Sequence, residues 1–326
     1  MGRKALVVGI DFYENGNNLH GCINDSYSVK AVLERNSDST INFDIKHKTA
    51  SDVNSMIERI ELKNDVMELF KDDSEIALFY FSGHGHIEFT GGYLITSECK
   101  HGDDGLPLND LIKIANDSPA KNKVIIIDSC HSGFTGKVDS SDKRSFISEG
   151  LTILTASSED QYALEENGTG VFTKLLVDAL NGSAANLIGE ISPGGIYAHI
   201  DQSLGAWEQR PIFKTNVKKF NVLRHVKPSI SLEDLRKITI YFPNKDSFFQ
   251  LDPSFEPERS GDEDSSFPKP TAQNIEIFSV LQKFNRVNMV VPVNAPHMWH
   301  AAINSKGCKL TVLGEHYWNL VNKGRI

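Results

Sequence analysis

The chain has 326 residues, of which 40% are hydrophobic and 24% charged, and its formal net charge is −9. This length and composition are typical of a globular protein with a buried core, and the length favours two domains. The acidic balance argues against a nucleic-acid-binding protein, because no basic stripe offsets it.

Strands and helices alternate in the first half of the chain. The apolar run at residues 5–10 predicts a buried strand and is too short for a signal peptide or a membrane span. Residues 24–35 predict a helix, and the apolar spacing of residues 51–70 predicts one long amphipathic helix. Further strands are predicted at 76–81, 124–127 and 151–156, and a further helix at 171–180. This α/β pattern predicts a mostly parallel sheet with helices on both faces.

The composition changes after Lys227. Residues 254–270 are rich in proline and acidic side chains, which predicts a flexible or irregular loop, and ordered segments resume from Ile275. We therefore predict a first domain at residues 1–225 and a small α+β domain at residues 230–326.

Two of the predicted strands end in unusual sequences. Strand IALFYF runs into SGHGH, which contains His84, and strand VIIID runs into SCHSG, which contains Cys130. Functional groups gather at the carboxyl ends of parallel strands, so neighbouring strands would project His84 and Cys130 from one edge. A cysteine thiolate is a nucleophile, and an imidazole can supply it or protonate a leaving amine. Backbone amides at Gly85 and Cys130, near Gly133, are the expected oxyanion hole.

Other interpretations of these residues remain open from the residues alone. A lone cysteine after a strand is usually a small core residue. A zinc site could in principle use His84, His86, Cys130 and His131, but no second cysteine lies nearby. The four cysteines, Cys22, Cys99, Cys130 and Cys308, include no CxxC pair, which favours a reducing cytoplasm over a disulfide framework.

The two strand-end motifs carry a family resemblance. IALFYFSGHG and VIIIDSCHSG resemble the caspase-like cysteine proteases, in particular the metacaspase branch, and VVGIDFY, LHGCINDS, LTILTASSEDQYALE, GVFTKLLVDAL and QRPIF extend the resemblance over residues 3–215. His84 and Cys130 stand 46 positions apart in the numbering, close to the spacing of about 50 in caspases. The resemblance implies a caspase-like fold and a protease of polypeptides, with His84 as general base and acid and Cys130 as nucleophile.

The resemblance also implies a substrate pocket. In metacaspases, residues at the positions of Asp25, Ser82 and Asp128 bind the residue before the cut. Two carboxylates suit Arg or Lys and would repel Asp. The alternative is that Asp25 caps a helix and Asp128 fixes a loop.

Two loops of the first domain carry further expectations. Some metacaspases bind calcium, and acids are grouped here at Glu98, Asp103, Asp104 and Asp110. Lys100 and His101 interrupt this group, so we predict a solvated acidic loop and no metal or other cofactor. Residues 134–149 read as an exposed, easily nicked loop, and self-cleavage is expected after Lys137, Lys143 or Arg144.

The second domain is dense in aromatic and histidine side chains, at Trp299, His300, His316, Tyr317 and Trp318. They fit either an ordinary aromatic core or a binding site for a planar, phosphate-bearing ligand such as a small nucleotide. By resemblance, bacterial caspase-like proteases serve stress or antiviral defence and are joined to a sensor. The rival hypothesis of another class is a catalytically silent caspase fold acting as a scaffold or signal-binding module, and the intact His–Cys pair argues against it.

Overall fold

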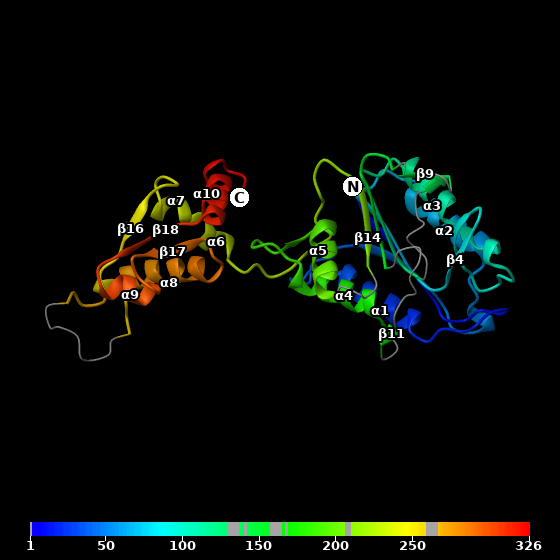
Figure 1. Ribbon diagram of the computed structural model, residues 1–326, viewed down its shortest axis with the longest axis horizontal. Coiled ribbons are helices and arrows are strands. Elements are labelled where there is room, and N and C mark those ends of the chain that lie inside the picture. Colours follow the sequence, from blue (N-terminus) through cyan, green and yellow to red (C-terminus); the bar gives the residue numbers. More distant parts are fainter. Residues whose placement is uncertain are drawn as a thin grey trace. The chain divides into compact units, whose positions relative to one another are not determined.

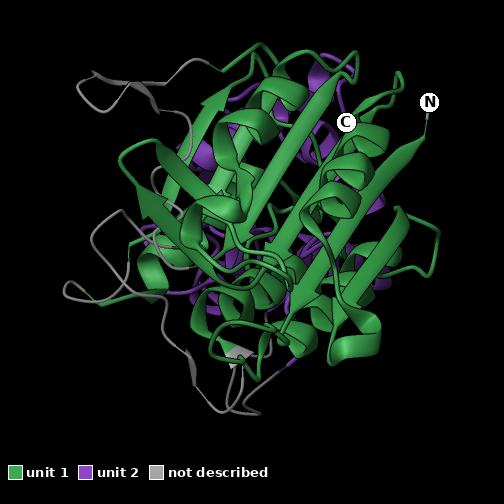
Figure 2. Ribbon diagram, turned by 90° about the vertical axis from the view of Figure 1, so that its right-hand side faces the viewer, with its two compact units in different colours: residues 1–227 green, residues 228–326 purple. Residues whose placement is uncertain are grey.

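The computed structural model describes residues 2–129, 137–139, 142–145, 147–156, 165–166, 169–205, 210–258 and 267–326. The chain forms two compact units, residues 1–227 and 228–326, coloured separately in Figure 2. The division falls between Lys227 and Pro228, inside the interval left between the two predicted domains.

A six-stranded sheet with the order β14-β10-β7-β3-β1-β2 forms the centre of the first unit. Its strands are β1 (Arg3–Ile10), β2 (Asp44–Ala50), β3 (Ile76–Ser82), β7 (Asn122–Asp128), β10 (Leu151–Thr155) and β14 (Ile212–Asn216). All neighbours pair in parallel except β14, which runs antiparallel to β10. The predicted mostly parallel sheet is therefore confirmed, and Figure 2 shows its strands side by side.

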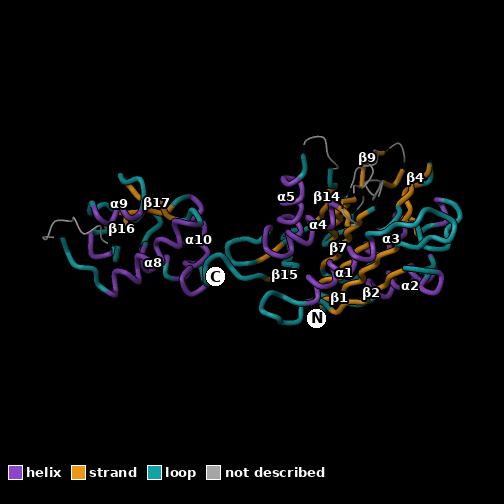
Figure 3. The backbone as a smooth tube through the Cα atoms, turned by 90° about the horizontal axis from the view of Figure 1, so that it is seen from below, coloured by secondary structure: helices purple, strands orange, loops and turns teal. Residues whose placement is uncertain are grey.

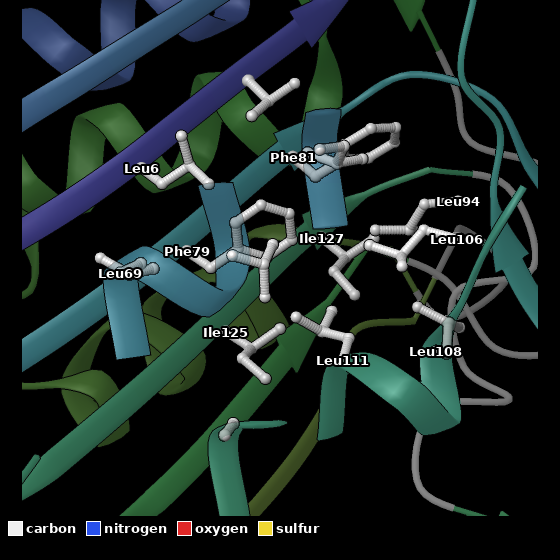
Figure 4. Close-up of a cluster of buried hydrophobic side chains, with 14 of the residues drawn as sticks. Leu6, Leu69, Phe79, Phe81, Leu94, Leu106, Leu108, Leu111, Ile125 and Ile127 are labelled. Atoms are coloured by element: carbon white, nitrogen blue, oxygen red, sulfur yellow. The ribbon is translucent and has the colours of Figure 1, made fainter. Parts of the chain in front are cut away.

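Helices cover both faces of this sheet. One face carries α1 (Cys22–Glu34), α4 (Val171–Asp178) and α5 (Pro193–Ser203), and the other carries α2 (Arg59–Phe70) and α3 (Leu108–Asn116) (Figures 1 and 3). Successive strand residues enter opposite cores: Phe79 lies in the α2/α3 core and Tyr80 in the α1/α4 core. Because both faces are buried, the strands read as continuous apolar runs. Figure 4 shows how strand residues such as Ile125 meet Leu69 of α2 and Leu111 of α3.

Short elements at the edges of the sheet complete the first unit. A three-stranded antiparallel group joins β4 (Gly85–Glu88), β5 (Gly91–Leu94) and β6 (Leu106–Pro107). Antiparallel pairs join β8 (Lys137–Asp139) to β9 (Asp142–Ser145), β11 (Glu165–Glu166) to β12 (Thr169–Gly170), and β13 (Glu190–Ile191) to β15 (Arg224–His225). Single turns of helix form at η1 (Val53–Ser55), η2 (Gly102–Asp104) and η4 (Ala179–Ser183).

The prediction of one long helix over residues 51–70 is wrong. The turn η1 is capped by Asp52, whose side chain accepts from the backbone N–H groups of Asn54 and Ser55, and α2 begins only at Arg59. Between them, Ile57 is buried and its backbone N–H donates to Ser97 Oγ at 3.2 Å. This tertiary anchor keeps the connecting backbone extended, so local apolar spacing does not decide the structure there.

The second unit is an α+β structure. Its antiparallel sheet has the order β16-β18-β17, made of β16 (Phe248–Gln250), β17 (Val290–Val293) and β18 (Gly307–Leu310). Its helices are α6 (Leu232–Arg236), α7 (Ile238–Tyr241), η5 (Pro253–Phe255), α8 (Ala272–Arg286), α9 (Met298–Ile303) and α10 (Val312–Asn322). The predicted loop at 254–270 is wrong at its start, because η5 forms there and Phe255 and Glu256 are buried; residues 259–266 lie outside the described part. No helix among the described residues is long and apolar enough to cross a membrane.

Candidate active site

Three neighbouring strands end side by side at the edge that carries the motifs. Gly9 of β1 pairs with Ser82 of β3, and Ser82 pairs with Asp128 of β7. His84 follows Ser82 by two residues, and Cys130 follows Asp128 by two. The adjacency of the strands on which the His84 and Cys130 prediction depends is therefore present, while Cys130 itself lies outside the described residues.

His84 is fixed through its backbone and its ring. Its backbone N–H donates to Tyr13 Oη at 2.7 Å, and the two rings lie 4.6 Å apart. Its Nε2 lies 2.8 Å from the carbonyl oxygen of Asn17. Because a carbonyl only accepts, this bond places a proton on Nε2, so in the neutral ring the lone pair lies on Nδ1.

Tyr13 is a support for His84 that the sequence analysis did not single out. Its hydroxyl accepts from His84 and donates to the carbonyl of Ile10 at 3.2 Å. Burial raises the pKa of the Tyr13 phenol well above its usual value, so the hydroxyl stays neutral and keeps both bonds. Gly83 lies against this hydroxyl, and a Cβ there would come within 2.7 Å of it. A side chain at position 83 would therefore displace the Tyr13 hydroxyl or the Phe81 ring.

The three predicted pocket residues come together on the α1/α4 side of the same edge. Asp25 and Asp128 are 1% and 6% exposed, and Ser82 Oγ donates to Asp25 Oδ2 at 3.3 Å. The backbone N–H of Gly170 donates to the Asp25 carboxylate at 3.1 Å. A Cβ on Gly170 would lie 2.5 Å from Asp128 Oδ2 and 3.1 Å from Asp25 Oδ2. Both carboxylates therefore face the same glycine.

Hydrogen bonds orient the Asp128 carboxylate. Thr173 Oγ1 donates to Asp128 Oδ2 at 2.7 Å, and the Tyr80 hydroxyl lies 2.6 Å from Thr173 Oγ1. Burial, followed by the negative charges of Asp128 and Asp25, raises the pKa of Tyr80 well above its usual value. Tyr80 therefore remains a donor to Thr173, which in turn donates to Asp128.

The alternative role of Asp25 as a helix cap does not describe its contacts. The N-cap residue of helix α1 is Gly21, which has no side chain that could cap the helix. The backbone N–H of Cys22 is bonded instead by Asp11 Oδ1 at 2.9 Å. Asp25 lies within the first turn, where the helix dipole favours a negative charge, and its oxygens bind Ser82 and Gly170.

Comparison with known proteins places this site in a family. The model of the caspase domain family matches residues 2–222. The chain belongs to the caspase domain family. The match confirms the family, fold class and cysteine-protease class expected from the sequence for this domain.

Individual relatives are more distant. Metacaspase-1 of Plasmodium falciparum (isolate 3D7) is 29% identical over 156 residues, which cover 40% of this chain and 24% of that protein. The chain thus spans about a quarter of that relative's length. Among solved structures, protein GSU0716 of Geobacter sulfurreducens has a TM-score of 0.52 at 14% identity, covering 70% of this chain and 98% of the other. Caspase-1 of Spodoptera frugiperda has a TM-score of 0.50 at 13% identity, with coverages of 71% and 92%. At these identities the two structures support the caspase fold alone.

The remaining predicted residues of the caspase domain are placed as follows. Gly85 begins β4 and pairs with Leu94, so its amide lies next to His84 at the strand end; Cys130, the other predicted oxyanion donor, lies outside the described residues. The His86 side chain hydrogen-bonds Glu88, with 2.8 Å between His86 Nε2 and Glu88 Oε1. Within the described residues no group of three or more His, Cys, Asp or Glu side chains could hold a metal ion.

The acidic group considered for calcium makes contacts within the protein. Glu98 Oε1 accepts from the backbone N–H of Arg59 at 2.7 Å. Asp104 accepts from the backbone N–H groups of Lys100 and His101, and Asp110 pairs with Lys63 at 2.9 Å. These bonds stabilise the loop and the start of η2.

In the second unit, the five predicted ligand residues fall in two groups. Trp299 and His300 lie in α9 with their rings 5.0 Å apart, and Trp299 Nε1 donates to the carbonyl of Glu258 at 3.4 Å. His316, Tyr317 and Trp318 lie in α10, where Trp318 Nε1 donates to the carbonyl of Phe242 at 2.6 Å and Tyr317 is buried. Figure 1 shows α9 and α10 at opposite ends of this unit, so the five side chains do not line one site.

Proposed function

We propose that this protein is an endopeptidase that uses Cys130 and His84 to cleave polypeptides after Arg or Lys. One observation carries the specificity: Asp25 and Asp128 are both buried, face Gly170 and lie at the same sheet edge as His84.

The chemistry of the pair suits a long cationic side chain. A guanidinium can donate two parallel bonds to one carboxylate, and an ammonium can donate three bonds around a point. An aspartate in this position would add a third negative charge beside Asp25 and Asp128, which is unfavourable in a region shielded from water. The site therefore selects against the residue that animal caspases accept.

The proposed reaction follows from the two catalytic groups. The Cys130 thiolate attacks the carbonyl carbon of the scissile peptide, and the carbon–nitrogen bond breaks while protonated His84 gives its proton to the leaving amine. Water then attacks the thioester, His84 accepts its proton, and the acid product leaves with the thiolate regenerated. Backbone N–H groups near the strand ends stabilise the oxyanion of each tetrahedral intermediate.

The test is a fluorogenic peptide library that varies only the residue before the cut. We expect Arg and Lys peptides to be cleaved, Cys130→Ala and His84→Ala to lower kcat by several orders of magnitude, and Asp25→Asn and Asp128→Asn to raise KM for basic peptides. Preference for Asp peptides would refute the pocket. Undiminished turnover in Cys130→Ala would refute the mechanism. Failure of the wild-type protein to cleave any peptide of the library would leave a non-catalytic signal-binding module as the remaining function.

We further propose that residues 228–326 regulate the protease in the cytoplasm by binding a small nucleotide-like ligand, in a role in stress or antiviral defence. The supporting observation is His300, whose buried Nδ1 has no hydrogen-bond partner among the described residues and whose ring lies beside Trp299. A planar base could stack on the half-buried Trp299 ring. The test is peptide cleavage and tryptophan fluorescence with a panel of mononucleotides and cyclic nucleotides. A chain ending at Lys227 with the same activity and regulation would refute this role.

A further inference from the structure

A second cavity opens beside His84, on the side away from the two carboxylates. It has a volume of about 260 Å³ and is formed by Tyr13, Ile95 and residues 15–16, 84–86 and 99–102. Tyr13 and Ile95 of its wall belong to or pack against the α2/α3 core, whereas Tyr80 and the α4 helix below Asp128 belong to the α1/α4 core. The cavity and the carboxylate pair therefore lie toward opposite faces of the sheet, with His84 at the edge between them.

The ionisable side chains that line the cavity are histidine, lysine, tyrosine and cysteine side chains, and no carboxylate is among them. His84, His86, His101 and Lys100 contribute nitrogen atoms, and none of its lining residues is Asp or Glu. Nearby acids have partners: Glu88 Oε1 lies 2.8 Å from Nε2 of the lining residue His86, Glu98 Oε1 accepts from the backbone N–H of Arg59, and Asp104 accepts from backbone N–H groups. Lys100 therefore gives this cavity a charge opposite to that of Asp25 and Asp128.

The path of a peptide past His84 connects the two sites. The residue before the cut is called P1, and the residue after it P1′. When the P1 side chain lies at Asp25 and Asp128, the nitrogen of the scissile peptide bond must reach His84, which protonates it as it leaves. The next side chain, P1′, is attached one carbon beyond that nitrogen. An extended chain continues away from the P1 side, which brings P1′ to the cavity lined by His86 and Lys100.

We propose that this cavity binds the P1′ side chain and prefers a carboxylate, Asp or Glu, with Lys100 as the residue that determines the preference. The proposal rests on the proposed protease function. The Lys100 ammonium attracts a P1′ carboxylate and repels a P1′ lysine, and the histidines add N–H donors. Because Lys100 is exposed, water and salt screen its charge. We therefore expect the attraction of an acidic P1′ residue and the repulsion of a basic one each to change kcat/KM by about two- to fivefold.

The experiment uses internally quenched peptides that are identical except for Asp, Gly or Lys at P1′. The full-length protein should cleave the Asp peptide about five- to twentyfold better than the Lys peptide at low salt, with Gly between them. Lys100→Gln should flatten this ratio, and Lys100→Glu should reverse it. The control Lys113→Glu makes the same charge change on an exposed residue of α3 outside the cavity and should leave the ratio intact.

The ratio of cleavage of the Asp and Lys P1′ peptides tests this proposal independently of the proposed P1 specificity. If the P1 library shows another preferred P1 residue, the specificity fails, and the same P1′ series built on that residue still tests the cavity. Equal cleavage of the three peptides by the wild-type protein, or a ratio that survives in Lys100→Gln, would overturn the proposal. An effect of Lys113→Glu equal to that of Lys100→Glu would overturn it as well, because the preference would then reflect net charge.

Discussion

Substituting Gly170 by alanine is expected to block the proposed site for the residue before the cut (P1) while leaving the fold in place. The new methyl carbon would lie 2.5 Å from Asp128 Oδ2, closer than an ordinary van der Waals contact. The obstructing atom is the end of a side chain, so the carboxylate can rotate away, but rotation breaks its 2.7 Å bond from Thr173. The backbone of Gly170 has φ −64° and ψ 132°, which any residue adopts, so the substitution adds no backbone strain.

These contacts set the expected magnitude. Disturbing one partner of a buried charge pair costs about 2–5 kcal/mol of binding. Taking the lower value because the carboxylate is displaced and not removed, we expect kcat/KM for an Arg peptide to fall about 30-fold. Overpacking should lower the free energy of unfolding by only about 1 kcal/mol.

The assay compares kcat/KM for an Arg peptide with labelling of Cys130 by a small thiol reagent that has no P1 side chain. The reagent should react at the wild-type rate, because only the P1 site has changed. Gly2→Ala is the control, since a Cβ there meets no atom within 4 Å. If Gly170→Ala retained kcat/KM within about twofold, the two carboxylates would not be the P1 site, and their convergence would have only a structural role.

Three further predictions concern other parts of the chain. Tyr13→Phe removes the acceptor of the His84 backbone N–H, so thermal unfolding and steady-state kinetics should show about 1–3 kcal/mol of lost stability and a lower kcat with KM little changed; an unchanged kcat would contradict a positioning role. Burial alone would raise the pKa of Asp234, but bonds from Lys283 and Lys237 outweigh it and hold the pKa below its usual value. A depressed carboxyl pKa stabilises the folded state above the unfolded value, so urea unfolding of Asp234→Asn should show about 1 kcal/mol of lost stability at neutral pH and a shrinking loss below about pH 4; a loss that did not depend on pH would contradict this. The prediction of a loop over residues 134–149 is wrong where β8 and β9 form, because Lys137 pairs with Ser145 and Asp139 with Asp142. Mass spectrometry of active protein should find self-cleavage after Lys137, Lys143 or Arg144, and full activity without a cut would show that processing is dispensable.

The sequence predicted the sheet edge because the information there is local. The runs IALFYF and VIII, which precede SGHGH and DSCHSG, are apolar on every residue, a pattern typical of strands buried on both faces. Strand β2, with the sequence DIKHKTA, was not predicted, because it is an edge strand with half-exposed positions and polar side chains. Its apolar signal is too weak to separate it from a loop.

The supporting residues of the site could not be read from the sequence, since their roles depend on contacts over long separations. Gly170 meets Asp25 across 145 positions, and Thr173 meets Asp128 across 45. Both lie in GVFTKLLVDAL, a segment that carries the family resemblance, but that segment does not show which residues they contact. The one local signal is that Gly170 stands directly before the first residue of α4. Because glycine is a common N-cap residue, this position indicates a helix start and not a contact with Asp25 or Asp128. Likewise, the density of aromatics at 299–318 did not show that α9 and α10 would place them apart.

The two sites on either side of His84 give the proposed active site a direction. Acids lie on the α1/α4 side and nitrogen bases on the α2/α3 side, so a peptide with a basic residue followed by an acidic one matches both. The same two residues in reverse order would place an acid against Asp25 and Asp128 and a base against Lys100, and each contact would be repulsive. A chain entering backwards would also present its carbonyl, and not its leaving nitrogen, to His84. Charge and catalytic geometry therefore select the same orientation of the substrate, which a single charged pocket could not enforce.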